Sequence, residues 1–293
     1  MIFTTRFAPS PTGPLHLGHA FSALLAYDMA QQQGGAFLLR LEDIDQSRAR
    51  THWEEQIYDD LKWLGVRWDE PVLRQSANMG SYQKALDKLW NLGILFQCNC
   101  SRSDIRGALA APQEGQQDIY GPDGLIYPGT CRGRCDYPKR SGAAAIRMNM
   151  EKSLEAISKQ GVNVLSFEET GAGNRRTITF DADDLLNTVG DVVLARRDMG
   201  TSYHLSVVID DSAQQMTHIV RGEDLFEATK IHVVLQKLLG LDTPVYHHHK
   251  LIRDDTGKRL AKRDDARAIA KYRADGLTPQ DIRRMVGLPP AST

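Results

Sequence analysis

The hydrophobic pattern of the first hundred residues alternates short apolar runs with amphipathic repeats. Apolar runs over residues 2–8 and 36–41 are each typical of a short buried strand. Between them, after a stretch broken by prolines and a glycine, residues 18–33 have the pattern of an apolar helix. Around 53–64 and 82–89, apolar residues recur every three or four positions and predict two amphipathic helices. This succession indicates an α/β fold that begins with a parallel sheet and crossover helices.

The pattern changes at about residue 98. Residues 98–140 are rich in Gly, Pro, Cys and charge and show little hydrophobic periodicity, which indicates an insertion. Further strands are expected at 143–148, 189–195, 205–209, 217–220 and 245–248, with a helix at 228–239, then a basic loop and two short helices. We therefore expect one large α/β domain that carries a smaller insertion.

Length and charge narrow the function classes. The 293-residue chain has 41% hydrophobic residues, enough for a sizeable core, and its 36 Lys and Arg nearly balance 37 Asp and Glu. Nucleic acid would therefore have to bind locally, at basic clusters that are also common on solvated loops. The clusters comprise Arg132, Arg134, Lys139 and Arg140, and then Arg253, Lys258, Arg259, Lys262 and Arg263. Without a secretory signal pattern or an apolar stretch of about 18 residues, we expect a soluble cytoplasmic protein with no membrane partner.

The segment from Arg6 to His19, RFAPSPTGPLHLGH, carries the most specific chemical signal. It lies where the first strand turns into a helix, and in an open α/β sheet this carboxyl edge is where ligands bind. The helix N-terminus offers N–H groups to phosphate, and His16 and His19, three positions apart, share one helical face. Two histidines at this spacing alone would more often cap the helix or lie on the surface. The surrounding residues favour an anion-binding site.

This segment closely resembles the HIGH motif of the class I aminoacyl-tRNA synthetases, in the form that the glutamyl and glutaminyl enzymes use. The resemblance implies a Rossmann-type parallel sheet and ATP-dependent activation of an amino acid as its adenylate. It also implies that His16 and His19 contact the ATP phosphates and stabilise the transition state as catalytic residues. The implied ATP-binding residues in this segment are His16, Gly18 and His19, and the implied amino-acid contacts are Arg6, Ala8 and Ser10.

A basic loop near the end of the chain, Gly257 to Arg263, resembles the KMSKS loop of the same family. Arg259 replaces the first lysine and Ala261 replaces the serine, whereas Lys262 keeps the second lysine. The resemblance implies that Arg259 and Lys262 bind ATP. We expect Lys262 to be catalytic, because it would neutralise charge that develops on the pyrophosphate. Without the upstream motif, a solvated basic loop would be the simpler explanation.

Glutamate would bring two carboxylates and one ammonium into the site, so arginines and a carboxylate should surround it. Such residues stand at or beside the predicted strand ends and match the family's glutamate-binding positions one by one: Arg6, Glu42, Tyr203 and Arg221. Each alone would more often be a structural or surface group. Together they favour an acidic amino acid, with its ammonium at Glu42 and a carboxylate at Arg221.

The histidine triplet His247, His248 and His249 invites a metal interpretation. Alternation along a strand sends the middle ring to the opposite face from the outer two, which prevents convergence on one ion. His248 matches a histidine that the family carries upstream of its basic loop. The resemblance therefore implies that His248 contacts ATP.

Four cysteines predict a structural zinc site. Cys98 and Cys100 leave the same face of an extended segment, and Cys131 and Cys135 return about thirty residues later. The residues alone favour four cysteine ligands, and unliganded buried cysteines are the alternative. The resemblance instead implies a Cys-x-Cys and Tyr-x-x-x-Cys pattern, with the ligands Cys98, Cys100, Tyr127 and Cys131 and with Cys135 as the alternative fourth ligand.

The short tail suggests one branch of the family. Only thirty residues follow Arg263, so we expect no anticodon-binding domain. With the Tyr-x-x-x-Cys pattern, this resembles the glutamyl-queuosine branch, which makes glutamyl-AMP without tRNA and transfers glutamate to the queuosine base in the anticodon loop of tRNA(Asp). The implied partners are L-glutamate, ATP with Mg²⁺, and tRNA(Asp) carrying queuosine, and we expect a monomer. A short glutamyl-tRNA synthetase charging a 3′ end and an inactive tRNA-binding paralogue are the alternatives.

The resemblance also implies a division of the chain. Residues 1–97 would form the first half of the nucleotide-binding domain, and residues 98–140 the zinc-bearing insertion. Residues 141–250 would hold the rest of the insertion and the second half of the nucleotide-binding domain. Residues 251–293 would hold the KMSKS-like loop and a short helical segment.

Overall fold

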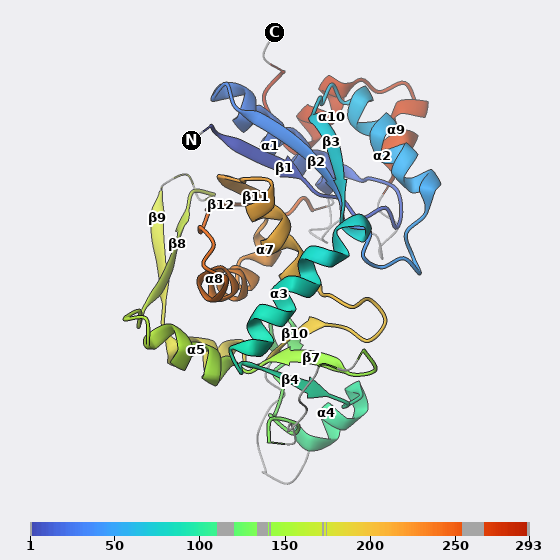
Figure 1. The fold of residues 1–293 in the computed structure, drawn as a ribbon. Coiled ribbons are helices and arrows are strands. Elements are labelled where there is room, and N and C mark those ends of the chain that lie inside the picture. Colours follow the sequence, from blue (N-terminus) through green and yellow to red (C-terminus); the bar gives the residue numbers. More distant parts are fainter. Residues whose placement is uncertain are drawn as a thin grey trace.

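The computed structural model describes residues 2–109, 120–133, 140, 142–171, 173, 175–253 and 267–291. Figure 1 shows an upper part built on parallel strands and a lower part that contains α4 (Arg102–Leu109) and an antiparallel sheet. The basic loop at residues 254–266 lies outside the described residues, and so does the predicted alternative ligand Cys135.

The N-terminal half of the fold is a parallel sheet in the order β1-β2-β3. Its strands are β1 (Thr4–Phe7), β2 (Ala36–Leu41) and β3 (Asp69–Arg74), and the crossover helices are α1 (Leu17–Gln32) and α2 (Thr51–Trp63). The expected strand–helix succession is therefore confirmed. The hydrophobic pattern does not predict β3, because its sequence DEPVLR has two acidic residues and a proline where a buried strand is normally apolar.

A second set of strands continues the parallel arrangement. Strands β11 (His218–Gly222), β12 (Val245–His249) and β8 (Leu165–Glu169) pair in parallel, and β9 (Arg176–Phe180) adds an antiparallel edge. The two sets meet where the Thr217 amide donates to the Thr4 carbonyl at 3.0 Å. Helix α8 (Ala228–Leu239) connects β11 to β12 with the predicted bounds. The Rossmann-type arrangement is thus confirmed, and it brings the carboxyl ends of β1, β2 and β11 close together.

The prediction of a strand at residues 205–209 is wrong. This segment lies in helix α7 (Tyr203–Ala213), whose first turn is capped by the Ser202 hydroxyl at 3.5 Å from the Leu205 amide. Nearly the whole helix is buried, including polar residues such as Ser206 and Asp210. A helix covered on all sides loses the apolar stripe that marks a surface helix, so its run of β-branched residues looked like a strand. Tyr203 accordingly begins a helix and does not stand at a strand end.

The lower part of the molecule is an antiparallel sheet of β10 (Val192–Ala195), β7 (Ala145–Met148) and β4 (Leu95–Cys98). Near it lies a small hairpin of β5 (Tyr120–Gly121) and β6 (Gly124–Leu125). Five helices complete the described structure around these sheets: α3 (Met79–Asn91), α5 (Met150–Ser158), α6 (Ala182–Thr188), α9 (Ile269–Ala274) and α10 (Pro279–Val286). The hairpin contacts α7 through Asp123, whose carboxylate lies 3.5 Å from His204 Nε2.

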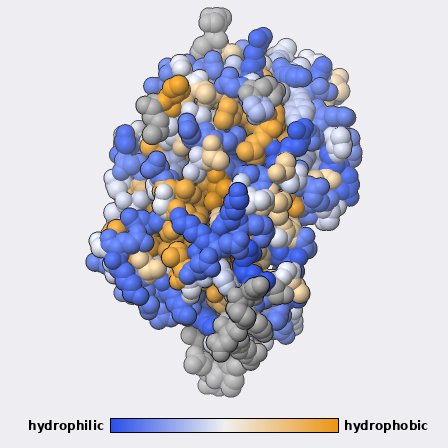
Figure 2. Space-filling model, in the orientation of Figure 1, coloured by the Kyte–Doolittle hydropathy of each residue, from blue (hydrophilic) through white to orange (hydrophobic). Residues whose placement is uncertain are grey.

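The C-terminal helices pack onto the first helix of the nucleotide-binding half. Arg283 on α10 forms two hydrogen bonds of 2.8 Å with the Asp28 carboxylate on α1. Figure 2 shows a mainly hydrophilic face with smaller hydrophobic areas. Among the described residues, no helix has the length and apolar character needed to span a bilayer.

Candidate active site

The turn from β1 into α1 forms an N-terminal cap made by two histidines. His16 is the N-cap residue, and its Nδ1 accepts from the Gly18 amide at 3.1 Å, while His19 Nδ1 accepts from the His16 amide at 3.2 Å. Their ring centroids lie 3.8 Å apart. The structure therefore brings His16, Gly18 and His19 together at the positive end of the α1 dipole. Each ring uses its Nδ1 atom for capping. The contact of these histidines with ATP phosphates stays a prediction.

The segment after the basic loop returns to this same turn. Ala268 forms an isolated antiparallel bridge with His16, and the Ile269 amide donates to the Leu15 carbonyl at 2.9 Å. Arg259 and Lys262 fall in residues 254–266, outside the described part of the chain. The loop that carries them therefore rejoins the described fold directly beside the histidine pair.

A buried ion network supports two predicted glutamate contacts, Arg6 on β1 and Glu42 directly after β2. Asp211 on α7 accepts from Arg6 at 3.0 and 3.2 Å and from Arg40 at 2.7 Å, and Arg40 also reaches Glu42 at 3.3 Å. Burial raises the pKa of Glu42, although Arg40 and Arg6 oppose this rise. Burial would also raise the pKa of Asp211, but Arg40 and Arg6 outweigh it and hold that pKa below its usual value. Arg6 and Glu42 are thus fixed side by side in one charged network.

Arg221 on β11 has quite different surroundings from those of Arg6. It is 6% exposed, and its guanidinium donates to His248 Nε2 at 3.2 Å, His232 Nδ1 at 3.1 Å and Thr229 Oγ1 at 2.6 Å. These acceptors are uncharged groups, and no carboxylate of the described residues lies within 4.0 Å of its nitrogens. A buried guanidinium without a carboxylate is costly. Among the described residues, Arg221 is therefore satisfied by uncharged acceptors alone, including the Leu225 carbonyl at 3.3 Å.

His248 lies between Arg221 and a buried carboxylate. Its Nδ1 forms a short hydrogen bond to Glu169, and its Nε2 accepts from Arg221, so both ring nitrogens have protein partners. Burial lowers the pKa of His248, and the Glu169 carboxylate opposes this. His247 and His249 turn the other way, toward Thr170 and Ser22, as strand alternation predicts. The ATP contact expected of His248 stays a prediction. In the structure, the ring contacts Arg221.

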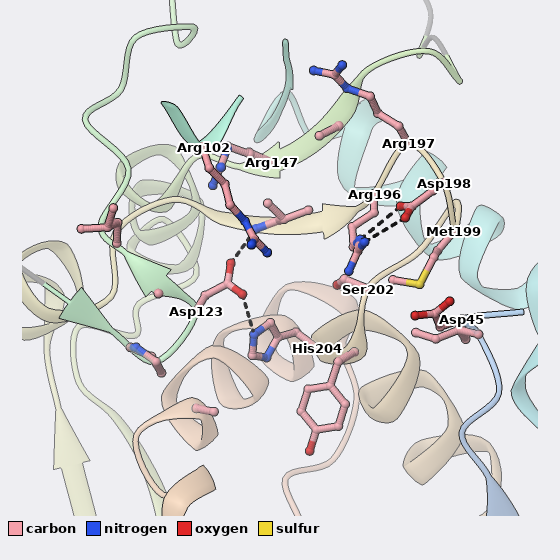
Figure 3. A pocket seen from close by; sticks show the side chains of 18 of the residues that line it. Asp45, Arg102, Asp123, Arg147, Arg196, Arg197, Asp198, Met199, Ser202 and His204 are labelled. Carbon is pink, nitrogen blue, oxygen red and sulfur yellow. Dashed lines mark hydrogen bonds and ion pairs between the residues drawn. The ribbon is translucent and has the colours of Figure 1, made fainter. Parts of the chain in front are cut away.

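A cavity of about 960 Å³ extends from Glu42 to the insertion, and Arg6 and Arg221 are not among the residues that line it. Glu42 and Tyr203 line it on one side, together with Ser10. Figure 3 shows the other side, where Asp123 contacts His204 and the side chains of Arg102 and Arg147 lie beyond Asp123. Burial raises the pKa of Tyr203, while Arg221 opposes the rise. Ala8 is half-buried in the loop after β1. The carbonyl of the next residue, Pro9, accepts from the Glu42 amide at 3.0 Å.

The cysteine cluster lies at the start of the insertion. The sulfur atoms of Cys98, Cys100 and Cys131 all lie within 4.8 Å of one another. The Tyr127 hydroxyl is 3.5 Å from Cys98 Sγ and 3.6 Å from Cys100 Sγ. Burial would raise the pKa of Cys131, but hydrogen bonds from Tyr127 and the backbone lower it to about 7, which favours the thiolate that binds metal. The four predicted ligands therefore converge, and they fit a metal ion.

Several residues that shape the site escaped the pattern analysis. Arg40 is the one charged residue in the otherwise apolar β2, which is a detectable sign of a buried ion pair. Asp211, His204 and His232 give no such sign, because they reach the site only through the fold. Asp123 belongs to a hairpin that the pattern did not resolve.

Comparison with known proteins gives a single family. The family described as tRNA synthetases class I (E and Q), catalytic domain, matches residues 3–291. A Glutamyl-Q tRNA(Asp) synthetase from Rhodobacter capsulatus is 59% identical over 286 residues, covering 97% of this chain and 99% of that protein. A protein of the same name from Geobacter sulfurreducens is 38% identical over 268 residues, which cover 92% of this chain and 78% of that protein. The chain also matches a Glutamate--tRNA ligase from Desulfitobacterium hafniense at 33% identity, but spans 56% of its length.

A solved structure has the same fold. A glutamate tRNA ligase from Elizabethkingia meningosepticum, in complex with its amino acid, has a TM-score of 0.75 and 26% identity. The match covers 98% of this chain and 60% of the ligase, so the chain spans less than two thirds of that protein. The chain belongs to the catalytic-domain family of the class I glutamyl- and glutaminyl-tRNA synthetases, and it is an ATP-using ligase of that type.

Proposed function

We propose that this protein activates L-glutamate as glutamyl-AMP and transfers the glutamyl group to the queuosine base in the anticodon loop of tRNA(Asp). In the first step, an oxygen of the glutamate α-carboxylate attacks the α-phosphorus of ATP, and the bond to pyrophosphate breaks. In the second, a hydroxyl oxygen of the queuosine cyclopentenediol attacks the adenylate carbonyl carbon. AMP leaves with the electron pair, and the hydroxyl proton passes to solvent.

The environment of Arg221 is the observation that carries the choice of amino acid. Its guanidinium is buried and donates only to uncharged acceptors among the described residues, so a substrate carboxylate would complete its surroundings. Glu42 lines the cavity and supplies a carboxylate for the substrate ammonium. Tyr203 interacts electrostatically with both Arg221 and Glu42, as a residue between the two ends of glutamate would. Arg6, Ala8 and Ser10 would complete the pocket.

The cap of α1 supports the proposed ATP site. His16, Gly18 and His19 lie at a helix N-terminus, where N–H groups and the dipole favour phosphate. The basic loop rejoins the fold beside His16, so Arg259 and Lys262 would reach the same phosphates. Mg²⁺ would accompany the nucleotide. His248 would also contact ATP, although both of its ring nitrogens already have partners in Arg221 and Glu169.

The identity of the acceptor rests on the relatives. Two proteins named Glutamyl-Q tRNA(Asp) synthetase match nearly the whole chain, and the first shares 59% of its residues. The match to a glutamate–tRNA ligase at 33% identity keeps 3′-end charging as the second candidate. The cavity extends from Glu42 to the insertion, where Arg102 and Arg147 could meet an incoming nucleotide.

The cysteine cluster would hold a structural zinc ion. Cys98, Cys100, Cys131 and Tyr127 converge, and thiolates with tetrahedral geometry are typical of zinc. We also propose a division of the chain into four segments. Residues 1–97 form the first half of the nucleotide-binding domain, and residues 98–140 form the zinc-bearing insertion. Residues 141–250 hold the rest of the insertion and the second half of that domain, and residues 251–293 hold the basic loop and a helical segment. The sheet of β4, β7 and β10 would support the insertion.

Two measurements test this function in sequence. ATP–pyrophosphate exchange should depend on glutamate and need no tRNA. Labelled glutamate should then attach to tRNA that contains queuosine and not to tRNA from cells unable to make it. Equal labelling of both preparations would instead assign 3′-end charging. An inactive paralogue would show no exchange, and ATP and glutamate would not raise its thermal midpoint synergistically.

A further inference from the structure

A chain of polar contacts, buried except at its outer end, runs from Arg221 to the insertion. Arg221 Nη1 lies 3.1 Å from His232 Nδ1, and His232 Nε2 lies 3.1 Å from His204 Nδ1. His204 Nε2 lies 3.5 Å from an Asp123 carboxylate oxygen, a contact visible in Figure 3. Its members come from β11, α8, α7 and the β5–β6 hairpin. Parts of the molecule far apart in sequence therefore meet in one line of polar contacts.

The chemistry of these groups fixes the direction of every hydrogen bond. A guanidinium can only donate, so His232 Nδ1 accepts from Arg221. Burial lowers the pKa of His232 well below its usual value, so the ring is neutral and carries its proton on Nε2. That proton points at His204 Nδ1, which must accept it. His204 therefore carries its own proton on Nε2, which points at Asp123.

We propose that Asp123, His204 and His232 are positioning residues that hold Arg221 for the substrate carboxylate, which makes the insertion hairpin part of the amino-acid site. This inference rests on the proposed function, because it takes Arg221 as a glutamate-binding residue. His204 and His232 are 6% and 2% exposed, so little of either ring is available to water. Both rings also pack against Tyr203, at centroid distances of 5.5 and 5.8 Å.

The hairpin end of this chain is anchored independently. The other Asp123 oxygen accepts from the Val193 amide at 3.3 Å, and Arg147 acts on the same carboxylate electrostatically. Burial would raise the pKa of Asp123, but His204 and Val193 outweigh it and keep the group ionised. Asp123 also lines the cavity. A nucleotide that enters the cavity to accept the glutamyl group would therefore contact the outer end of the series of polar contacts that holds Arg221.

The test compares two substitutions at one position by ATP–pyrophosphate exchange in the full chain. His204→Leu removes the acceptor for His232, and we expect the KM for glutamate to rise about tenfold or more while the KM for ATP stays unchanged. His204→Asn places an amide oxygen near the former Nδ1 position and should restore most of the lost affinity. Asp123→Asn, at the more exposed end, should give a smaller rise. His52→Leu, on the exposed face of α2, serves as the matched control.

Further readouts separate the proposal from a general structural role. In NMR spectra of protein with ¹⁵N-labelled histidine, both His204 and His232 should show the Nε2–H tautomer. An Nδ1–H tautomer at either ring would overturn the proposed series of hydrogen bonds. An unchanged KM for glutamate in His204→Leu, or a parallel rise of both KM values, would also overturn it. Arg221→Leu tests the underlying function, since a normal KM for glutamate there would refute the glutamate site itself. A defect in Arg221→Leu with normal His204 variants would refute only the positioning chain.

Discussion

Asp211 holds Arg6 through two hydrogen bonds, from Nε at 3.0 Å and from Nη2 at 3.2 Å, across 205 positions of the sequence. The same carboxylate accepts from Arg40 at 2.7 Å. Burial alone would lower the pKa of Arg40, but Asp211, Glu42 and Asp210 raise it, so the guanidinium stays charged inside the protein. One aspartate on α7 thus sets the position of the two arginines that border the Glu42 carboxylate.

Replacing Asp211 should therefore cost stability as well as substrate affinity. Asp211→Asn keeps the shape but leaves two buried guanidinium groups without their shared counter-ion. We expect a loss of about 3 kcal/mol in the free energy of unfolding, measured by urea denaturation. Glu168→Gln is the control, because its ion pair with Arg175 is at the surface and solvent screens it, so the loss of stability should be much smaller. Equal effects of the two substitutions would mean that the buried network does not stabilise the fold.

Some helices and strands could be predicted from the sequence and others could not. Strand β2 and helix α8 have the bounds expected from their patterns. Helix α7 was mistaken for a strand, since burial on all sides removed its amphipathic period. Strand β9 is an edge strand with three exposed positions, and β8 carries two glutamates and a serine among its five residues, so neither has a clear apolar run.

The candidate site shows the same division. Arg6, His16 and His19 could be predicted because they occupy one continuous motif in a turn. His204 and His232 could not, since their contact spans 28 positions and joins two helices whose packing no local pattern reports. Local motifs therefore identified the groups expected to touch substrates, and the fold was needed to find the groups that hold them.

Lys262 is expected to act on the pyrophosphate. Lys262→Ala should lower the rate of ATP–pyrophosphate exchange by roughly 10²–10³-fold, the usual loss for one preorganised donor. Lys271→Ala on the exposed face of α9 removes a nearby positive charge and should leave the rate unchanged. An exchange rate in Lys262→Ala equal to that of the control would remove Lys262 from the mechanism.

The cysteine cluster should bind one zinc ion per chain. We expect metal analysis of the purified protein to find zinc in this ratio, and Cys100→Ser to lose most of it, since thiolates bind zinc far better than hydroxyls. Removal of the metal with a chelator should lower the thermal midpoint.

The fourth ligand can be identified by a matched pair of substitutions. Tyr127→Phe should weaken zinc binding if the hydroxyl that lies 3.5 Å from Cys98 Sγ completes the site. Cys135→Ser should then leave the zinc content unchanged. The reverse result would assign Cys135 as the ligand and leave Tyr127 with its hydrogen bond to the Cys131 amide.

Asp60 on α2 is a carboxylate that opposes folding at neutral pH. Burial raises its pKa to about 6, against a partial offset by Arg273, and its Oδ2 has no hydrogen-bond partner among the described residues. The folded state therefore binds a proton more tightly than the unfolded state. Stability should fall as the pH rises from about 4 to about 6 and then remain level.

Asp60→Asn removes this ionisation and should stabilise the protein by on the order of 2 kcal/mol at pH 8, with little effect at pH 4. Urea denaturation at the two pH values measures the difference. Glu55→Gln, on the exposed face of the same helix, removes an equal charge and should change stability little at either pH. A gain from Asp60→Asn that is as large at pH 4 as at pH 8 would show that packing, and not the buried charge, is what the substitution improves.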